Sequence, residues 1–322
     1  MMSSFKRRLI ILVIFLGVLS LLYISGPRLD MSVQLTPIDL PPSLDDYIQE
    51  SESRFSDITP GAEKSIVWAA EPDTRTEYAV VYLHGFSATR QESAPVAERI
   101  AEALGANVFN TRFAGHGRGG DAMIEGSLNR WLNDTREAMA IGRRLGDKII
   151  LLGVSTGGTA AVWAALNDSE QLAALVLMSP NFGPKDGRTT ILTWPWGKQV
   201  ARLMVGPERS WTPQNDGQAR YWTTRYPTEA MLPMMAMVKT IEQQELSTIQ
   251  TPSLWIYSES DEVLNVAKIE RAYREVGSGI KQSLIINDSE DPSHHVLAGD
   301  ILSPSKVSDV VETVLRCIAT IN

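Results

Sequence analysis

The segment at residues 153–158 (GVSTGG) constrains the fold of this chain more than any other segment. It lies directly between a continuous apolar run (KIILLGV), which predicts a strand buried on both faces, and an alanine-rich run, which predicts a helix. Such a short reversal forces its middle residue to a positive φ and requires small neighbours, here Gly153 and Gly157. We therefore expect Ser155 at the tip of a tight turn, with its hydroxyl exposed at the positive end of a helix.

Strands and helices alternate along most of the chain after residue 64. We predict strands at 65–70, 77–83, 107–111, 148–154, 173–178, 252–257 and 282–286, and helices at 94–104, 128–145, 157–166, 266–276 and 306–318. The first of these helices has Ser93 as a candidate N-cap and Gly105 just past its end. This alternation predicts an α/β fold with a mostly parallel central sheet and helices on both faces.

The alternation stops between residues 181 and 246, which we interpret as a lid inserted into a core formed by 65–180 and 247–322. The insert holds five of the eleven methionines and four of the eight tryptophans, Trp194, Trp196, Trp211 and Trp222. An insert in an α/β domain is expected above the carboxyl ends of the strands, where sites form. These tryptophans are candidates for binding an apolar substrate group, and the equal alternative is that the aromatic and methionine side chains form the lid's own small core.

Residues 1–26 are typical of a targeting segment. Leu9 to Ile24 carry no charge, and Lys6, Arg7 and Arg8 precede them. We favour an uncleaved signal anchor forming a single transmembrane helix over a cleaved signal peptide, and both over a buried helix of a soluble protein. The basic cluster predicts the N-terminus in the cytoplasm and the remaining chain on the other side of the membrane, facing the periplasm if the membrane is a bacterial inner membrane. Cleavage would make the protein secreted.

Residues 27–64 are polar, contain five prolines and are predicted to be a tether and lead-in with one short helix near 44–55. The chain of 322 residues has a net charge of −8, which becomes −11 without residues 1–26, so a nucleic-acid-binding protein is not expected. Cys317 is the only cysteine, which excludes an intramolecular disulfide and a cysteine-rich zinc site. We expect no metal ion and no cofactor, and the sequence does not define an oligomeric state.

A serine nucleophile needs a base, and the chain offers four histidines. Only His294 and His295 follow the last predicted strand, where the base must lie in this architecture. His84 is expected to shape a loop near the site, and His116 is expected to be a turn or pocket-wall residue.

The acid is expected after the strand at 252–257. Asp261 is the best placed, because apolar Val263 and Leu264 follow it and can anchor the turn, and Glu259 is the alternative. Three further carboxylates are expected only to cap or solvate the histidine loop, namely Asp288, Glu290 and Asp291. Two backbone N–H groups must hold the developing oxyanion, and we assign them to Phe86 and Thr156.

These motifs resemble the α/β-hydrolase superfamily from about Ser65 to the C-terminus. They are most similar to the branch that holds monoacylglycerol lipases, carboxylesterases and serine-aminopeptidase-like proteins. The matching elements are the oxyanion turn 84–86 (HGF), the turn 112–117 (RFAGHG), Trp131 with Asp134, the acid turn 260–264 (SDEVL) and the histidine turn 295–300 (HVLAGD). The resemblance implies an α/β-hydrolase fold with the chain order Ser155, Asp261, histidine. It also favours His295 over His294, because the family's catalytic histidine precedes a valine.

The expected function is cleavage of carboxylic esters through an acyl-enzyme on Ser155, as in an esterase or lipase. The expected partner is a small-molecule ester, and a lipid ester would suit a membrane-anchored enzyme. Thioesterase and aminopeptidase-like activities are alternatives, and a non-catalytic binding protein on a hydrolase scaffold is a third. A peptidase would need a lid carboxylate to bind the substrate amine, for which the candidates are Glu208, Asp216, Glu229, Glu242 and Glu245.

Overall fold

The computed structural model of the chain describes residues 4–321 and contains a seven-stranded sheet at its centre. In spatial order its strands are β1 (Ser65–Val67), β3 (Asn107–Asn110), β2 (Thr76–Leu83), β4 (Gly146–Val154), β5 (Leu172–Met178), β8 (Ser253–Tyr257) and β9 (Lys281–Ile285). Only β1 runs antiparallel to its neighbour, and the other five pairings are parallel. The predicted mostly parallel sheet is confirmed.

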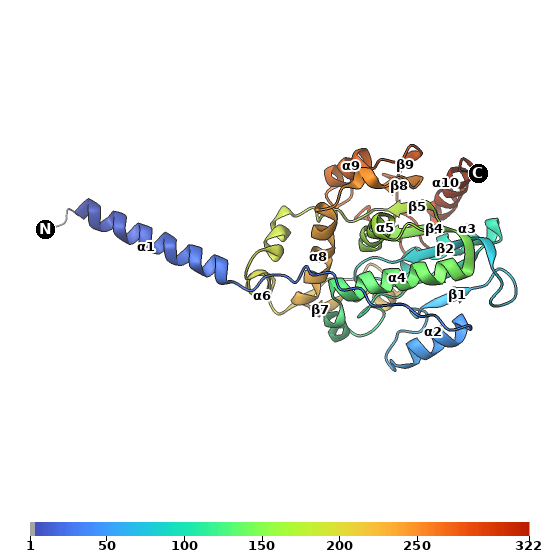
Figure 1. Cartoon of the computed structure of the whole chain (residues 1–322), viewed down its shortest axis with the longest axis horizontal. Helices are drawn as coiled ribbons and strands as arrows, with labels where there is room; N and C mark the ends of the chain where they lie inside the picture. The colour runs from blue at the N-terminus through green and yellow to red at the C-terminus, as the bar shows by residue number, and fades with distance from the viewer. Residues whose placement is uncertain (1–3, 322) are drawn as a thin grey trace.

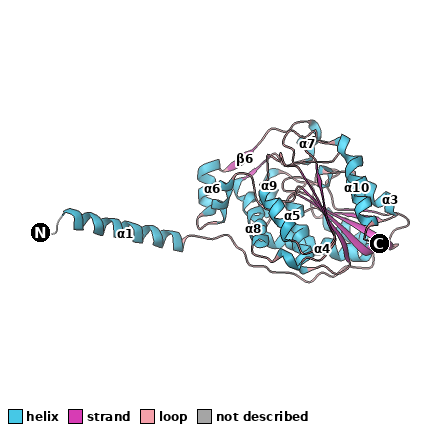
Figure 2. Cartoon of the chain, turned by 90° about the horizontal axis from the view of Figure 1, so that it is seen from above, coloured by secondary structure: helices cyan, strands magenta, loops and turns pink. Residues whose placement is uncertain are grey.

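Helices cover both faces of this sheet (Figure 2). They are α3 (Val96–Leu104) and α10 (Val307–Ala319) on one face, and α4 (Leu128–Leu145), α5 (Thr156–Asn167) and α9 (Val266–Glu275) on the other. Successive strand residues point to opposite faces, so Val80 belongs to the core under α3 and α10 while Val81 belongs to the core under α4 and α5. Strands buried on both faces therefore read as continuous apolar runs.

The two ends of α3 test the boundaries predicted for this helix. The α3 C-terminus is set by Gly105, which adopts a left-handed φ of 60°. Ser93 is not the N-cap of α3, which begins after Pro95 without a side-chain cap. The physical reason is a separate 3-10 turn, η1 (Arg90–Glu92), which is followed by Ser93 and moves the start of the helix from the predicted residue 94 to Val96.

The insert between β5 and β8 contains α6 (Gly197–Val205), α7 (Asp216–Tyr221) and α8 (Met231–Glu242). It also contains the antiparallel strand pair β6 (Glu208–Ser210) and β7 (Arg225–Pro227). A small core within the insert joins Leu192, Ala201, Tyr226, Met231 and Met235 and also includes Met123 from outside it. The insert thus has its own packing, and α8 also lies against α5 of the main body.

Helix α1 (Ser4–Ser25) extends away from the rest of the molecule (Figure 1). Among the described residues, one helix is long and apolar enough to cross a membrane, at Phe5–Ser25 with a mean hydropathy of 2.5 and no burial. At 1.5 Å per residue α1 is about 33 Å long, which matches a hydrocarbon core of about 30 Å. The first three residues of the predicted targeting segment lie outside the described residues.

The segment after α1 follows the surface of α4. The N–H groups of Gln34 and Thr36 donate to the side chains of Asn129 and Asn133, at 2.6 and 2.8 Å. Arg144 donates to the carbonyl groups of residues 41 and 42. Residues 27–64 are therefore held against the main body over much of their length. A tether would be expected to have few such contacts.

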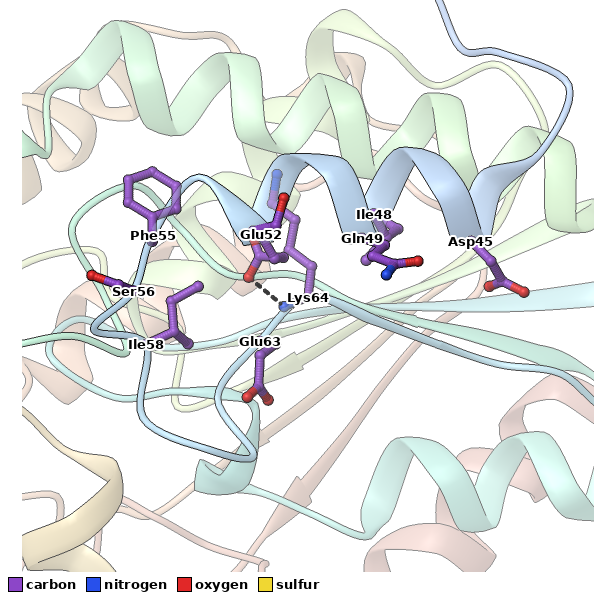
Figure 3. Close-up of a pocket in the computed structure, with 10 residues that line it drawn as sticks. Asp45, Ile48, Gln49, Glu52, Phe55, Ser56, Ile58, Glu63 and Lys64 are labelled. Atoms are coloured by element: carbon purple, nitrogen blue, oxygen red, sulfur yellow. Dashed lines mark hydrogen bonds between the residues drawn. The ribbon is translucent and has the colours of Figure 1, made fainter.

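Helix α2 (Leu44–Ser53) is fastened to the body at its C-terminal end. Glu52 accepts two hydrogen bonds from the buried guanidinium of Arg112, at 2.7 and 2.8 Å. It also accepts from the backbone N–H of Lys64 at 3.0 Å, across the depression that Figure 3 shows between α2 and the loop before β1. Because Arg112 also donates to the carbonyl of His116, this ion pair supports the turn that follows β3.

Candidate active site

Ser155 occupies the turn between β4 and α5 with φ 51° and ψ −116°. A Cβ atom on Gly157 would lie 2.0 Å from the carbonyl oxygen of Leu83, and one on Gly153 would lie 2.5 Å from the carbonyl oxygen of Gly157. Both positions therefore require glycine, as the sequence predicts. The close packing explains how the body holds Ser155 in a strained conformation that a free loop would abandon.

Asp261 and His295 form a buried pair. The Nδ1 atom of His295 lies 2.8 Å from Oδ2 of Asp261, and the side chain of Asp261 is fully buried. The other carboxylate oxygen of Asp261 accepts the N–H groups of Val263 and Leu264 at 2.7 and 2.8 Å. The N–H groups of the turn after β8 thus hold Oδ1 of the carboxylate, and the imidazole of His295 binds Oδ2.

The surroundings of His295 favour the charged imidazolium. Burial alone would lower the pKa of His295, but the charge and hydrogen bond of Asp261 oppose it, and the pKa lies above its ordinary value. Glu92 and Asp291 contribute further in the same direction. Since Nδ1 donates to a carboxylate, the neutral ring carries its proton there and leaves Nε2 as the basic nitrogen.

Ser155 and His295 line the same cavity, which has a volume of about 540 Å³. Ser155 is 7% exposed, and among the described residues its hydroxyl makes no hydrogen bond, so the Ser155–His295 contact is not formed in this structure. In enzymes without bound substrate, the distance between nucleophile and base is commonly longer than a hydrogen bond, and it shortens when substrate binds.

Two backbone N–H groups beside Ser155 lack a protein acceptor. Within residues 4–321, neither the N–H of Phe86 nor that of Thr156 is hydrogen-bonded. The carbonyl of Gly85 is held by Nδ1 of His84 at 2.8 Å and by the N–H of Ala88 at 3.3 Å. In a trans peptide the next N–H, that of Phe86, points the opposite way, which leaves it available to an anion.

His84 and His116 are buried behind this turn. The N–H of Phe113 donates to Nε2 of His84 at 3.0 Å, so His84 carries its proton on Nδ1. Burial lowers the pKa of His84 to about 4 and that of His116 well below its ordinary value. Both rings are neutral at physiological pH, as befits residues that shape the turn.

Trp131 and Asp134 of α4 clamp the turn that follows β3. The Trp131 indole donates to the carbonyl of Ala114 at 3.0 Å, and Asp134 accepts the N–H of the same residue at 2.7 Å. Burial raises the pKa of Asp134 to about 6. These contacts agree with the interpretation of Trp131 and Asp134 as residues that support the structure of the turn.

The alternatives to the acid and base lie elsewhere. His294 is near Ser289 and does not contact Asp261, while Glu259 is exposed and accepts from Asn287 at 3.0 Å. Asp291 caps the histidine loop by accepting the N–H groups of His295 and Val296 at 3.1 and 2.9 Å. Among the remaining loop carboxylates, Asp288 pairs with Lys306. Glu290 accepts the N–H of Ser305 at 3.2 Å, so among the three loop carboxylates the contacts show the expected capping of the histidine loop for Asp291.

The insert between β5 and β8, which the sequence predicts to be a lid, contributes much of the cavity wall. Its aromatic and methionine lining residues are Trp211, Trp222, Tyr226, Met231 and Met234, and Phe86 of the main body also lines the cavity, with its ring edge-to-face on Tyr226 at 5.4 Å. Trp194 and Trp196 do not line the cavity. They lie on the outer surface, 51% and 38% exposed. The four lid tryptophans proposed from the sequence therefore divide into two at the cavity and two outside it.

None of the five lid carboxylates considered for amine binding lines the cavity. Glu208 pairs with Arg225, and Glu242 pairs with Lys268 at 2.7 Å. Among the described residues, no group of three histidine, cysteine, aspartate or glutamate side chains is placed to hold a metal ion.

Sequence reasoning missed Glu92. Its carboxyl group is buried, lines the cavity with Ser155 and accepts the N–H of Gly85 at 2.6 Å. The only available signal was an acidic residue six positions after the oxyanion turn, and nothing in the local pattern indicated that a 3-10 turn would direct it inward.

The strand order, the serine turn and the Ser155, Asp261, His295 chain order define a member of the α/β-hydrolase superfamily. Residues 74–290 match the family described as serine aminopeptidase, S33, so the chain belongs to that family. No curated protein shows a significant match to the chain.

Solved structures show the same fold. One of the metagenome-derived lipolytic enzymes LipS and LipT is similar with a TM-score of 0.68 and 23% identity, over 82% of this chain and 99% of that chain. The monoacylglycerol lipase of Paleococcus ferrophilus has a TM-score of 0.58 and 13% identity, over 80% and 98%. A soluble variant of monoglyceride lipase from Saccharomyces cerevisiae has a TM-score of 0.57 and 11% identity, over 92% and 97%.

Proposed function

We propose that this protein is a membrane-anchored serine hydrolase that cleaves carboxylic esters. The observation that carries the proposal is the buried Asp261–His295 pair, whose imidazole lines one cavity with the strained Ser155. Beside Ser155 stand the N–H groups of Phe86 and Thr156, which lack an acceptor among the described residues. Each is a recognised component of acyl-transfer sites.

In the proposed reaction, Nε2 of His295 takes the proton of Ser155 while Oγ attacks the ester carbonyl carbon. The N–H groups of Phe86 and Thr156 hold the negative oxygen, and Asp261 stabilises the imidazolium without accepting its proton. Collapse of the intermediate breaks the bond to the alcohol, which leaves with the proton from His295. Water then repeats the sequence on the acyl-enzyme and releases the acid.

A substrate with an apolar acyl chain suits the cavity, since aromatic and methionine side chains form much of its wall. The lid also adjoins the proposed anchor, because the Trp196 indole donates to the carbonyl of Leu22 at 2.8 Å. Exposed Leu203 and Met204 lie on the same lid helix, α6. These contacts favour a lipid ester drawn from the membrane that α1 enters. The similar solved structures named for lipolytic activity support the same substrate class.

We further propose the arrangement in which residues 1–26 are an uncleaved anchor, 27–64 a lead-in, 65–180 and 247–322 the catalytic core, and 181–246 the lid. The basic residues in the first turns of α1, Lys6, Arg7 and Arg8, favour an orientation with the core on the non-cytoplasmic side.

The test is labelling of the full chain in detergent with a fluorophosphonate probe, together with hydrolysis of p-nitrophenyl esters of increasing chain length. Ser155→Ala should abolish both signals, whereas the exposed-site control Ser169→Ala should retain them. Absence of labelling in folded wild-type protein would refute the serine mechanism.

An aminopeptidase is the second candidate because the matched family carries that description. Aminoacyl anilides assayed beside the esters separate the two activities. Faster cleavage of the anilides, measured as kcat/KM, would replace the ester proposal with the peptidase one.

A further inference from the structure

Glu92 lies at the end of η1, between the oxyanion turn and the histidine loop. Its side chain is 2% exposed. One oxygen, Oε2, accepts the N–H of Gly85 at 2.6 Å, and Oε1 has no protein partner among the described residues. A Cβ atom built on Gly85 would lie 2.7 and 2.9 Å from the two carboxyl oxygens and 3.1 Å from Cβ of Ser155. The carboxyl group is therefore a near neighbour of the proposed nucleophile.

No lysine or arginine compensates this buried acid. Within residues 4–321, no basic nitrogen lies within 4.0 Å of the Glu92 carboxyl group. The titratable groups that act on it are His295 and Asp291 from the loop after β9, and Tyr82 from β2 also senses its charge. Burial raises the pKa of Glu92 to about 7, while the N–H of Gly85 and the charge of His295 oppose that rise. The pKa of Glu92 therefore lies near neutral pH, the pKa of His295 lies above its ordinary value, and each charge acts on the other group.

The backbone around Glu92 is fixed on both sides. Its own N–H donates to the carbonyl of Thr89 at 3.0 Å. A Cβ atom on Gly299 would lie 2.5 Å from the Glu92 carbonyl oxygen, so the histidine loop packs directly on this residue. Glu92 thus touches both loops that must be aligned for the proposed reaction.

We propose that Glu92 is a positioning residue, whose carboxylate holds the peptide N–H of Gly85 and adds a second negative charge acting on His295. Fixing Gly85 orients the adjacent Phe86 N–H, and the added charge stabilises the imidazolium that forms in the transition state. This inference rests on the proposed serine mechanism for its kinetic part only, because the contact with Gly85 exists without it.

Two variants separate the two effects. Glu92→Gln keeps an oxygen acceptor for Gly85 and removes the charge, whereas Glu92→Ala removes both. Glu102→Gln, at an exposed position of α3, is the matched control. For each full-length protein in detergent, kcat and KM for a p-nitrophenyl ester are measured against pH, and KM is also measured for an aminoacyl anilide. Amide hydrogen exchange of the segment containing Gly85 is measured by mass spectrometry.

We expect Glu92→Ala to lower kcat by about tenfold or more with little change in KM, and to speed exchange at Gly85. Glu92→Gln should recover most of kcat at neutral pH and retain slow exchange. Its acid limb should move to lower pH by about 0.3 unit or more, because His295 loses a charge that favours its protonated form. Glu102→Gln should match wild type in kcat, in the position of the acid limb and in the exchange rate at Gly85.

Three results would overturn the proposal. The first is unchanged exchange at Gly85 in Glu92→Ala, and the second is an acid limb of Glu92→Gln that coincides with wild type. The third is a rise in KM confined to aminoacyl substrates, which would make Glu92 an amine-binding residue. If wild-type protein lacks activity altogether, the proposed function fails, and the exchange measurement alone still decides whether Glu92 positions the turn.

Discussion

The imidazole of His295 donates through Nδ1 to Oδ2 of Asp261 at 2.8 Å, although the two residues are 34 positions apart in the chain. The pair is formed by two loops that leave adjacent parallel strands, β8 and β9, at the same edge of the sheet. Because Asp261 is also anchored by the N–H groups of its own turn, it can orient the ring with little freedom to move.

Replacing Asp261 by asparagine should reduce kcat about 10⁴-fold with a small change in KM. An amide at this position favours the wrong imidazole tautomer while preserving the shape of the site. Steady-state ester hydrolysis measures the effect. Glu259→Gln, which alters the exposed alternative acid, should behave as wild type, and an equal loss in that variant would contradict the assignment.

The activity should depend on pH through His295, which must be neutral to accept a proton. Its pKa lies above the ordinary value of 6.5, so kcat/KM should fall as pH falls through a midpoint above 6.5. A pH–rate profile in buffers of constant ionic strength measures that midpoint. A midpoint clearly below 6.5 would show that Asp261 and its neighbours do not favour the imidazolium as described.

Gly157, two residues after the proposed nucleophile, should tolerate no side chain. Gly157→Ala would bring a Cβ atom to 2.0 Å from a backbone oxygen of β2, and we expect a loss of about 3 kcal/mol or more in the free energy of unfolding. Denaturant unfolding followed by tryptophan fluorescence tests this. Gly119→Ala is the control, since a Cβ atom there meets nothing within 4 Å, and its stability should stay near wild type.

The Glu52–Arg112 ion pair should hold the N-terminal segment to the core. Glu52→Gln leaves a buried guanidinium without a charged partner, and we expect destabilisation of about 3 kcal/mol or more. Thermal unfolding measures the change. Glu50→Gln on the same helix disrupts only the exposed pair with Arg54 and should shift the free energy of unfolding by less than about 0.5 kcal/mol.

A charge in the middle of α1 should weaken membrane insertion. Leu16→Arg costs about 3 kcal/mol at the centre of a spanning helix, so more of the protein should leave the membrane fraction on alkaline extraction. Lys6→Gln, outside the apolar core, should remain membrane-bound. Full extraction of the wild-type protein would rule out the anchor.

The serine turn and the end of α3 could be predicted from the sequence, because residues close together in the chain produce them. Ser155 sits on its turn because a buried strand runs into a helix with glycines on both sides, and Gly105 ends α3 because it adopts a left-handed conformation. Glu92 could not be found this way, since its burial depends on η1 and on a loop more than two hundred residues away. The position of Trp194 and Trp196 outside the cavity likewise depends on how the insert folds over the core.

By itself, the sequence determined the mostly parallel sheet, the strained serine turn and the apolar N-terminal helix, because each follows from hydrophobic periodicity and glycine spacing within a short stretch. The family resemblance favoured His295 over His294, and the tertiary structure shows the contact of His295 with Asp261. Only the tertiary structure decided that residues 27–64 bind along α4 and that a buried carboxyl joins the oxyanion turn. Those relationships link distant segments, and their energies come from burial and hydrogen bonds that exist only once the strands have brought the loops together.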